Sequence, residues 1–182
     1  ADGRIKALLE FGCGTGRFTR WWTQIGIEAT GADISPLMLS QAIDLFNGPL
    51  VMADSHNMPF KDNSFDAVAF ITTFEYYKDP CLVIQEAARV AKYGLAFGMM
   101  NRNSPKYIRR RVQQMFGKNP FYITASFYTP SSLIRVIDQA LQGRRYSIRW
   151  MCTGLPKLFP VQQWKIPYGD FFGLYVHFDD VE

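Results

Sequence analysis

Three glycines at alternate positions, directly after a short apolar segment, constrain this chain more than any other feature. Residues 5–11 are mostly apolar, which predicts a buried strand, and Gly12, Gly14 and Gly16 follow at once. Glycine lets the backbone turn sharply and lets a ligand approach without a Cβ in the way. A helical stretch over residues 17–25 comes next, and its free N–H groups favour an anion. The sequence therefore predicts a strand, a ligand-binding turn and a helix.

The spacing of these glycines excludes a dinucleotide-binding fingerprint. That fingerprint is Gly-x-Gly-x-x-Gly. Counted from Gly12, its third glycine would fall on Arg17, and counted from Gly14 it would fall on Thr19. A nicotinamide or flavin site of this type is therefore not predicted.

Strand and helix signals alternate along the rest of the chain. Further strands are expected at residues 28–34, 50–53, 65–72, 93–100, 146–151 and 173–178. Four helices are expected to begin where a capping residue precedes proline, at Ser35-Pro36, Asp79-Pro80, Ser104-Pro105 and Thr129-Pro130. Three of these helices are expected to end at Gly94, Gly117 and Gly143. This alternation predicts an α/β fold with a mostly parallel sheet covered on both faces.

Length and composition favour one globular domain. The chain has 182 residues, of which 48% are hydrophobic and 20% charged. No apolar run is long enough to cross a bilayer, and the first residues do not read as a signal peptide. Cys13, Cys81 and Cys152 are scattered and lack metal-ligand spacing. We therefore expect a single domain over residues 1–182, in the cytoplasm and without a metal site.

Acidic residues close three of the predicted strands. Glu10, Asp33 and Asp54 each fall near the carboxyl end of a strand. In an open parallel sheet, ligands bind outside these ends, near the point where the strand order reverses. Acids in such turns also cap the local backbone. The residues alone leave both interpretations open for Asp33 and Asp54.

Three segments together resemble the class I S-adenosylmethionine (SAM)-dependent methyltransferases, especially the type 11 group that includes ubiquinone and menaquinone methyltransferases. LLEFGCGTG (8–16) is similar to the first motif of that family, GADIS (31–35) to its second, and ADSHNMPFKDNSFD (53–66) to its third and fourth. The similarity runs from about Ala7 to Met100. It implies a Rossmann-like three-layer sandwich with a mostly parallel seven-stranded sheet and an antiparallel last strand. It also implies SAM as the cofactor and S-adenosylhomocysteine (SAH) as its product.

The resemblance also assigns cofactor contacts to particular residues. Asp33 would bind the two ribose hydroxyls, and Asp54 would meet the adenine amino group. Glu10 would lie near the methionine portion of SAM, whose amino group would face the backbone of Ile71. The full set of implied cofactor-binding residues is Glu10, Gly12, Cys13, Gly14, Gly16, Asp33, Ile34, Met38, Asp54, Ser55 and Ile71.

Glu75 is the candidate catalytic base. It follows the fourth predicted strand in TTFEYY, where the family often has Glu-His and this chain has Glu75-Tyr76. The methyl group of SAM is already electrophilic, so the protein mainly has to align it with the acceptor. Glu75 fits either a base or a structural residue that sets the polarity of the pocket, and no nucleophilic side chain is expected. Tyr76 and Tyr77 are candidate walls of an acceptor pocket.

The acceptor is expected to be a small molecule, and a basic segment suggests its charge. Ten Lys and Arg residues lie between Arg102 and Arg149, against the single acid Asp138. They would attract an anionic or lipid-like acceptor, although a solvated helix face explains the charge as well. Residues 101–130 and 152–172 are expected to lie on the substrate side. The N-terminal lid helices of the family are expected to be missing from this chain.

The same residues suggest two alternative functions. A protein or RNA methyltransferase would use the basic segment 102–149, but no nucleic-acid motif accompanies it. The Asn-Pro-Pro-Tyr-type tetrad of such enzymes is also absent, because the fourth strand is followed by ITTF. A non-catalytic partner subunit with the same fold is the second alternative. The intact set of glycines, Asp33 and Asp54 argues against it.

Overall fold

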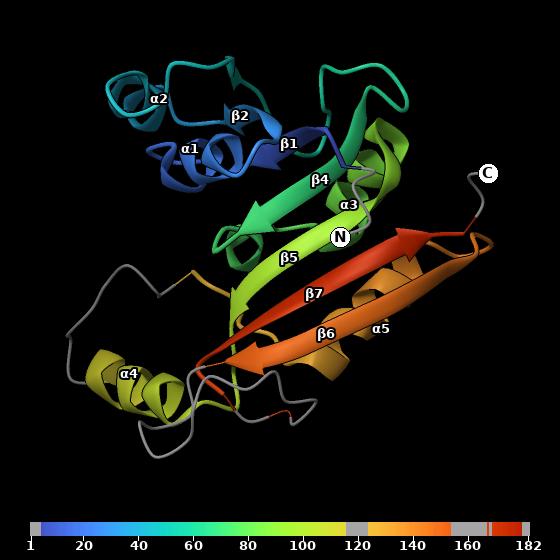
Figure 1. Ribbon diagram of the computed structural model, residues 1–182. Helices are drawn as coiled ribbons and strands as arrows, with labels where there is room; N and C mark the ends of the chain where they lie inside the picture. Colours follow the sequence, from blue (N-terminus) through green and yellow to red (C-terminus); the bar gives the residue numbers. More distant parts are fainter. Residues whose placement is uncertain (1–4, 116–123, 154–166, 168, 180–182) are drawn as a thin grey trace.

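Seven strands form one sheet in the part of the chain that the structure, a computed structural model, describes, which is residues 5–115, 124–153, 167 and 169–179 (Figure 1). Their order is β3-β2-β1-β4-β5-β7-β6. The strands are β1 (Ala7–Phe11), β2 (Glu28–Asp33), β3 (Leu50–Met52), β4 (Phe65–Ile71), β5 (Ala91–Met100), β6 (Tyr146–Thr153) and β7 (Phe171–Phe178). Strand β7 runs antiparallel to both of its neighbours, β5 and β6, whereas the other pairs of neighbouring strands are parallel. The predicted fold class is confirmed.

The proline-led helices begin at the predicted residues. The helical elements are α1 (Arg17–Gln24), α2 (Pro36–Ile43), the 3-10 turn η1 (Phe74–Tyr76), α3 (Pro80–Val90), α4 (Pro105–Met115) and α5 (Pro130–Ala140). The side chains of Ser35, Asp79 and Thr129 each accept a hydrogen bond from the backbone N–H three residues further on. Ser104 does the same for Tyr107, at 3.1 Å. Each cap satisfies an N–H that has no partner within its helix. None of the helices among the described residues is long and apolar enough to cross a bilayer.

The prediction that Gly94 ends a helix is wrong. Helix α3 ends at Val90, and the chain passes directly into β5. Gly94 lies inside β5, where an added Cβ would come within 2.0 Å of the Val176 carbonyl oxygen in β7. The glycine therefore accommodates a neighbouring strand, which its local sequence does not reveal. Gly143 has a left-handed φ of 85° three residues after α5, and Gly117 lies outside the described residues.

The two faces of the sheet carry different cores. Alternate residues of β1 point to opposite sides, so Leu8 packs near Trp22 of α1 while Leu9 belongs to the larger core. That larger core joins the sheet to α3 and α5 through Val83, Ile84, Ala87, Leu133 and Ile137. Figure 1 shows α3 and α5 together on one side of the sheet, with α1 and α2 beside its β1–β3 end. This is a three-layer α/β arrangement.

The sheet has a switch point between β1 and β4. The chain runs outward from β1 to β3 and then returns to place β4 on the other side of β1. The loops after β1, β2, β3 and β4 therefore meet at one edge, which is where open α/β sheets bind ligands. Helix α4 lies beyond the carboxyl end of β5, at the lower left of Figure 1.

Candidate functional site

The glycine turn is fastened to the end of β2. Gly12, Gly14 and Gly16 have φ values of 74°, 55° and 73°, in the left-handed region that favours glycine. The Gly12 N–H donates to the Ala32 carbonyl at 2.7 Å. The Gly14 N–H donates to Asp33 Oδ2 at 2.8 Å. The predicted turn and the predicted ribose-binding acid therefore form one hydrogen-bonded unit.

The three glycines are needed for different reasons. A Cβ on Gly12 would lie 2.1 Å from Thr73 Oγ1, and a Cβ on Gly16 would lie 3.3 Å from the Ala42 side chain of α2. At Gly14, by contrast, no described atom lies within 4 Å of the Cβ position. Only Gly14 thus has the open space that an approaching ligand requires. The other two glycines serve the packing of the turn itself.

Asp33 combines a bonded carboxylate with exposed apolar neighbours. Its Oδ1 accepts a hydrogen bond from the Ser35 N–H at 2.9 Å, so each of its oxygens has one backbone donor and room for another. Ile34 follows it and is 66% exposed, and Met38 in the first turn of α2 is 39% exposed. A carboxylate beside exposed apolar side chains suits a nucleoside, which presents hydroxyls and a flat apolar ring. The residues at this strand end therefore fit the nucleoside part of SAM.

Asp54 also has a local partner. Its Oδ1 accepts from the His56 N–H at 2.9 Å and lies 2.8 Å from His56 Nδ1. These hydrogen bonds hold the pKa of Asp54 below its usual value. The side chain is 54% exposed, so its second oxygen stays accessible. Asp54 is therefore a turn acid, as one interpretation of the sequence had it, and remains able to accept a further hydrogen bond.

Glu10 is buried beneath the turn. Its side chain is 1% exposed, and Thr19 Oγ1 of α1 donates to its Oε2 at 2.7 Å. Burial raises the pKa of Glu10 to about 7, although the Thr19 hydrogen bond opposes this rise. Burial likewise raises the pKa of the neighbouring Cys13 thiol to about 12. A thiol with so high a pKa stays protonated near neutral pH.

The loop after β4 begins with a strained residue. Strand β4 ends at Ile71, and Thr72 has a φ of 54°, which is unusual for a β-branched side chain. The Thr72 N–H is held by the Gly98 carbonyl at 2.8 Å. The turn directs Thr73 against Gly12, so the loops after β1 and β4 are in contact.

Glu75 is enclosed in that loop. It is 1% exposed, and its Oε1 accepts from the Met100 N–H at 3.3 Å. Its Oε2 is buried and makes no hydrogen bond with the described residues. Burial raises the pKa of this carboxyl group. One carboxylate oxygen of Glu75 is therefore buried without a hydrogen-bond partner among the described residues, which is uncommon for an acid with a purely structural role.

The structure distinguishes the two tyrosines that the sequence had proposed as walls of an acceptor pocket. The Tyr77 hydroxyl is buried and makes no hydrogen bond of good geometry with the described residues, but the side chains of Thr73 and Ser55 lie close enough to oppose the rise in its pKa that burial causes. The Tyr77 ring lies edge-on to His56, with 6.2 Å between centroids, so it connects the loops after β3 and β4. Nothing in the Tyr76-Tyr77 pair indicated which of the two would be buried. Tyr76 is exposed.

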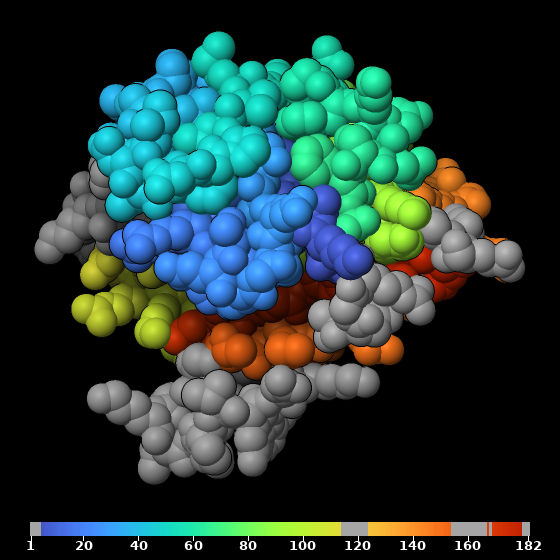
Figure 2. All heavy atoms as spheres, turned by 45° about the horizontal axis from the view of Figure 1, so that its top comes forward, coloured from blue at the N-terminus to red at the C-terminus, as the bar shows by residue number. Residues whose placement is uncertain are grey.

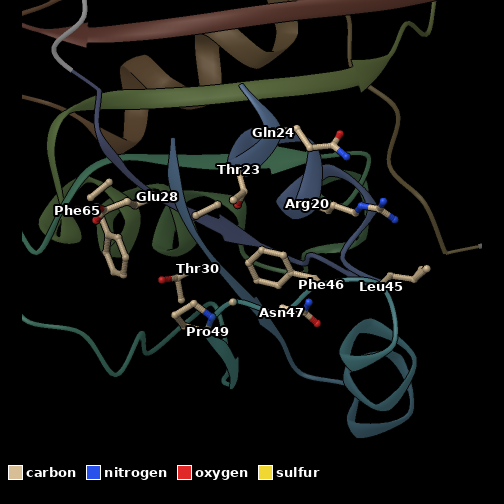
Figure 3. Close-up of a pocket in the computed structure, with 13 residues that line it drawn as sticks. Arg20, Thr23, Gln24, Glu28, Thr30, Leu45, Phe46, Asn47, Pro49 and Phe65 are labelled. Carbon is tan, nitrogen blue, oxygen red and sulfur yellow. The ribbon is translucent and has the colours of Figure 1, made fainter. Parts of the chain in front are cut away.

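A cleft of about 690 Å³ lies elsewhere on the molecule (Figure 3). It is lined by residues of α1, the first half of β2 and the loop before β3, together with Ala7 of β1 and Phe65 of β4, and none of the predicted cofactor residues belongs to it. Among the residues that the structure describes, no three His, Cys, Asp or Glu side chains come together in a way that could hold a metal ion.

Comparison with known proteins relates this chain to methyltransferases. Residues 9–97 match a family model described as a methyltransferase domain. A demethylmenaquinone methyltransferase of Thermotoga maritima is 36% identical over 90 residues, which are 48% of this chain and 39% of that protein. An uncharacterized protein of Methanocaldococcus jannaschii is 31% identical over 133 residues, which are 72% of this chain and 62% of that protein. The chain thus spans less than two thirds of either relative.

Solved structures share the whole fold. A SAM-dependent methyltransferase of Thermotoga maritima, described as a possible histamine N-methyltransferase, is 27% identical with a TM-score of 0.76. The similarity covers 96% of this chain and 83% of that one. Magnesium protoporphyrin IX methyltransferase of Synechocystis, solved with bound SAH, has a TM-score of 0.70 at 17% identity, over 98% of this chain and 77% of that one.

Proposed function

Because this chain carries a class I SAM-dependent methyltransferase domain of the type 11 group, with SAM as its cofactor, we propose that it transfers a methyl group from SAM to a small-molecule acceptor. The observation that carries the proposal is the Gly14–Asp33 hydrogen bond, which joins an open glycine turn to a strand-end acid at the switch point. Bound SAM supplies a sulfonium-activated methyl group. The protein has to hold the donor and acceptor in line and keep water away.

The nucleoside end of SAM is assigned to the ends of β2 and β3. The carboxylate of Asp33 is held in place by two backbone N–H groups, and its remaining lone pairs would accept the two ribose hydroxyls. Ile34 and Met38 would cover the adenine ring and bury apolar surface that is otherwise exposed. Asp54 would accept from the adenine amino group through the oxygen that His56 leaves accessible. Ser55 would line the same side.

The methionine end is assigned to the turn after β1. Gly14 offers space, while Gly12, Cys13 and Gly16 shape the turn. The buried Glu10 would favour the cationic amino group, and that group would shift Glu10 toward its ionised form. The Ile71 carbonyl at the end of β4 is the second partner proposed for the amino group.

The acceptor side is assigned from the names of relatives and from the basic segment of this chain. Relatives named demethylmenaquinone methyltransferase and malonyl-[acyl-carrier protein] O-methyltransferase support an anionic or lipid-like acceptor. The basic segment 102–149 and the regions 101–130 and 152–172 would lie on that side of a single domain covering residues 1–182. Residues 116–123, 154–166 and 168 of these regions are outside the described residues. Glu75 is proposed as the base, or as the residue that sets the polarity of the pocket.

Calorimetry with SAH tests the proposal. We expect saturable one-to-one binding, and we expect Asp33→Asn to weaken it about 100-fold, because a charge-assisted pair of ribose hydrogen bonds is lost. Asp44→Asn, at an exposed position just after α2, is the matched control and should bind SAH as the unaltered chain does. Absence of SAH binding would reject the proposal. Equal affinity in Asp33→Asn would reject the ribose assignment alone.

A further inference from the structure

Helix α1, all of which the structure describes, buries a single residue, Thr19. Figure 2 shows α1, coloured blue, on the surface of the molecule. Phe18 and Arg20 on either side of Thr19 are exposed, whereas Thr19 itself is 0% exposed. A hydroxyl group is costly to bury unless it forms a hydrogen bond. A threonine in this position therefore needs a partner inside the molecule.

That partner is the carboxylate of Glu10. The Thr19 hydroxyl donates to Glu10 Oε2 at 2.7 Å, and Thr19 is the only described residue that donates to this carboxylate. The Cys13 thiol belongs to the same buried group, since the Thr19 hydroxyl lies close to it as well. The pKa of Cys13 is raised to about 12, so this thiol stays uncharged near neutral pH. Glu10 is therefore the one member of the group that can carry a charge.

The Thr19 hydroxyl favours the charged form of Glu10. A hydroxyl that donates to a carboxylate stabilises the ionised acid, whereas burial stabilises the protonated acid. These opposing effects leave the pKa of Glu10 at about 7. Because this value lies close to neutral pH, the loss of one hydrogen bond is enough to decide whether Glu10 carries its charge.

We infer that Thr19 is a positioning residue, whose hydroxyl keeps Glu10 oriented and ionised beneath the glycine turn and thereby favours ligands with a cationic amino group. The inference rests on the proposed function, in which the methionine end of SAM lies at this turn. Glu10 needs no direct contact with the ligand, because surrounding protein screens a buried charge only weakly. A ligand with the same nucleoside but no amino group gains nothing from Thr19.

Two ligands separate the two ends of the site. SAH carries the amino group, whereas 5′-methylthioadenosine has the same nucleoside thioether without the amino acid. Thr19→Val keeps the shape of the side chain and removes its hydroxyl, so we expect SAH binding about tenfold weaker in calorimetry at about pH 7.5. Binding of 5′-methylthioadenosine should not change. Thr19→Ser retains the hydroxyl and should bind SAH as the unaltered chain does.

A double substitution tests whether Thr19 acts through Glu10. Glu10→Gln should also weaken SAH binding about tenfold, and the further change Thr19→Val should then alter the affinity by less than about twofold. Thr23→Val, at an exposed position one turn further along α1, is the matched control. The Thr23 hydroxyl donates to the Thr19 carbonyl and not to Glu10, so this variant should bind SAH as the unaltered chain does.

Four results would overturn the inference. Thr19→Val could bind SAH without loss, or it could weaken both ligands equally, which would indicate a purely structural role. Thr19→Ser could fail to bind SAH normally, or the two substitutions could lower the affinity independently. Binding of 5′-methylthioadenosine reports that the site of each variant is folded. If the unaltered chain binds neither ligand, the proposed function fails and this inference with it. If the unaltered chain binds both ligands and one of the four results is found, this inference alone fails.

Discussion

The loops after β2 and β4 meet at the same edge of the sheet, but the acidic residues that they carry, Asp33 and Glu75, lie in different environments. Both Asp33 oxygens accept backbone N–H groups, and the carboxylate faces a turn with open space. Glu75 is enclosed, and one of its oxygens makes no hydrogen bond with the described residues. The first arrangement is a preformed binding surface. The second leaves a buried carboxylate oxygen without a partner among the described residues, which is costly for folding and is typical of groups kept for chemistry.

Gly12 joins the two regions, and its substitution should have the largest effect. Gly12→Ala would place a Cβ within 2.1 Å of Thr73 Oγ1 at a left-handed φ. We expect the free energy of unfolding in urea to fall by about 4 kcal/mol. Gly14→Ala is the matched control, because it has the same kind of φ without the clash and should cost about 1 kcal/mol. Equal losses would mean that the two loops are not in contact.

The second largest effect concerns Glu10, the buried acid beneath the glycine turn, which should make the free energy of unfolding depend on pH. The pKa of Glu10 rises from 4.5 to about 7 on burial, so the folded state holds the proton more tightly than the unfolded state. The free energy of unfolding should therefore fall by up to about 3 kcal/mol as the pH rises from 4.5 to 7, and Glu10 should add no further change above that. Urea unfolding at pH 5 and pH 8 measures this difference.

Replacing Glu10 by its uncharged amide, glutamine, is the control for this pH effect. Glu10→Gln should flatten the pH dependence, while Glu28→Gln, at an exposed strand start, should leave it as it is. An unchanged slope in Glu10→Gln would show that Glu10 titrates as it does in the unfolded chain.

The smallest expected effect concerns Tyr77. No hydrogen bond of good geometry reaches its buried hydroxyl from the described residues, although the side chains of Thr73 and Ser55 lie close to it, so Tyr77→Phe should change the free energy of unfolding by less than about 1 kcal/mol. Tyr146→Phe is the comparison, since that hydroxyl donates to Asp138 and its loss should cost about 0.5–1 kcal/mol. Thermal unfolding of both variants measures the difference. A clear loss in Tyr77→Phe would reveal an additional partner.

The sequence predicted those parts of the molecule that depend on neighbouring residues. Proline-led caps such as Ser35-Pro36 act within one turn, and the order of strands and helices leads to a switch point at the glycine turn. Contacts between segments that are distant in the sequence could not be predicted from local signals. The role of Gly94 depends on its contact with β7. The exposure of Tyr76 and the burial of the Tyr77 hydroxyl depend on how the loops after β3 and β4 pack together. The residues assigned to SAM remain predictions, although the structure brings the turn, Asp33 and the loop after β4 together.

The antiparallel strand β7 has a consequence for the synthesis of the protein. It lies between β5 and β6, so β6 joins the sheet only through a strand that follows it in the chain. While a ribosome is still adding residues 171–178, β6 and the apolar side of α5 have no completed sheet to pack on. This surface is therefore prone to aggregation until β7 inserts between β5 and β6. Truncation before Phe171 should leave the β5 edge open to pairing with other chains.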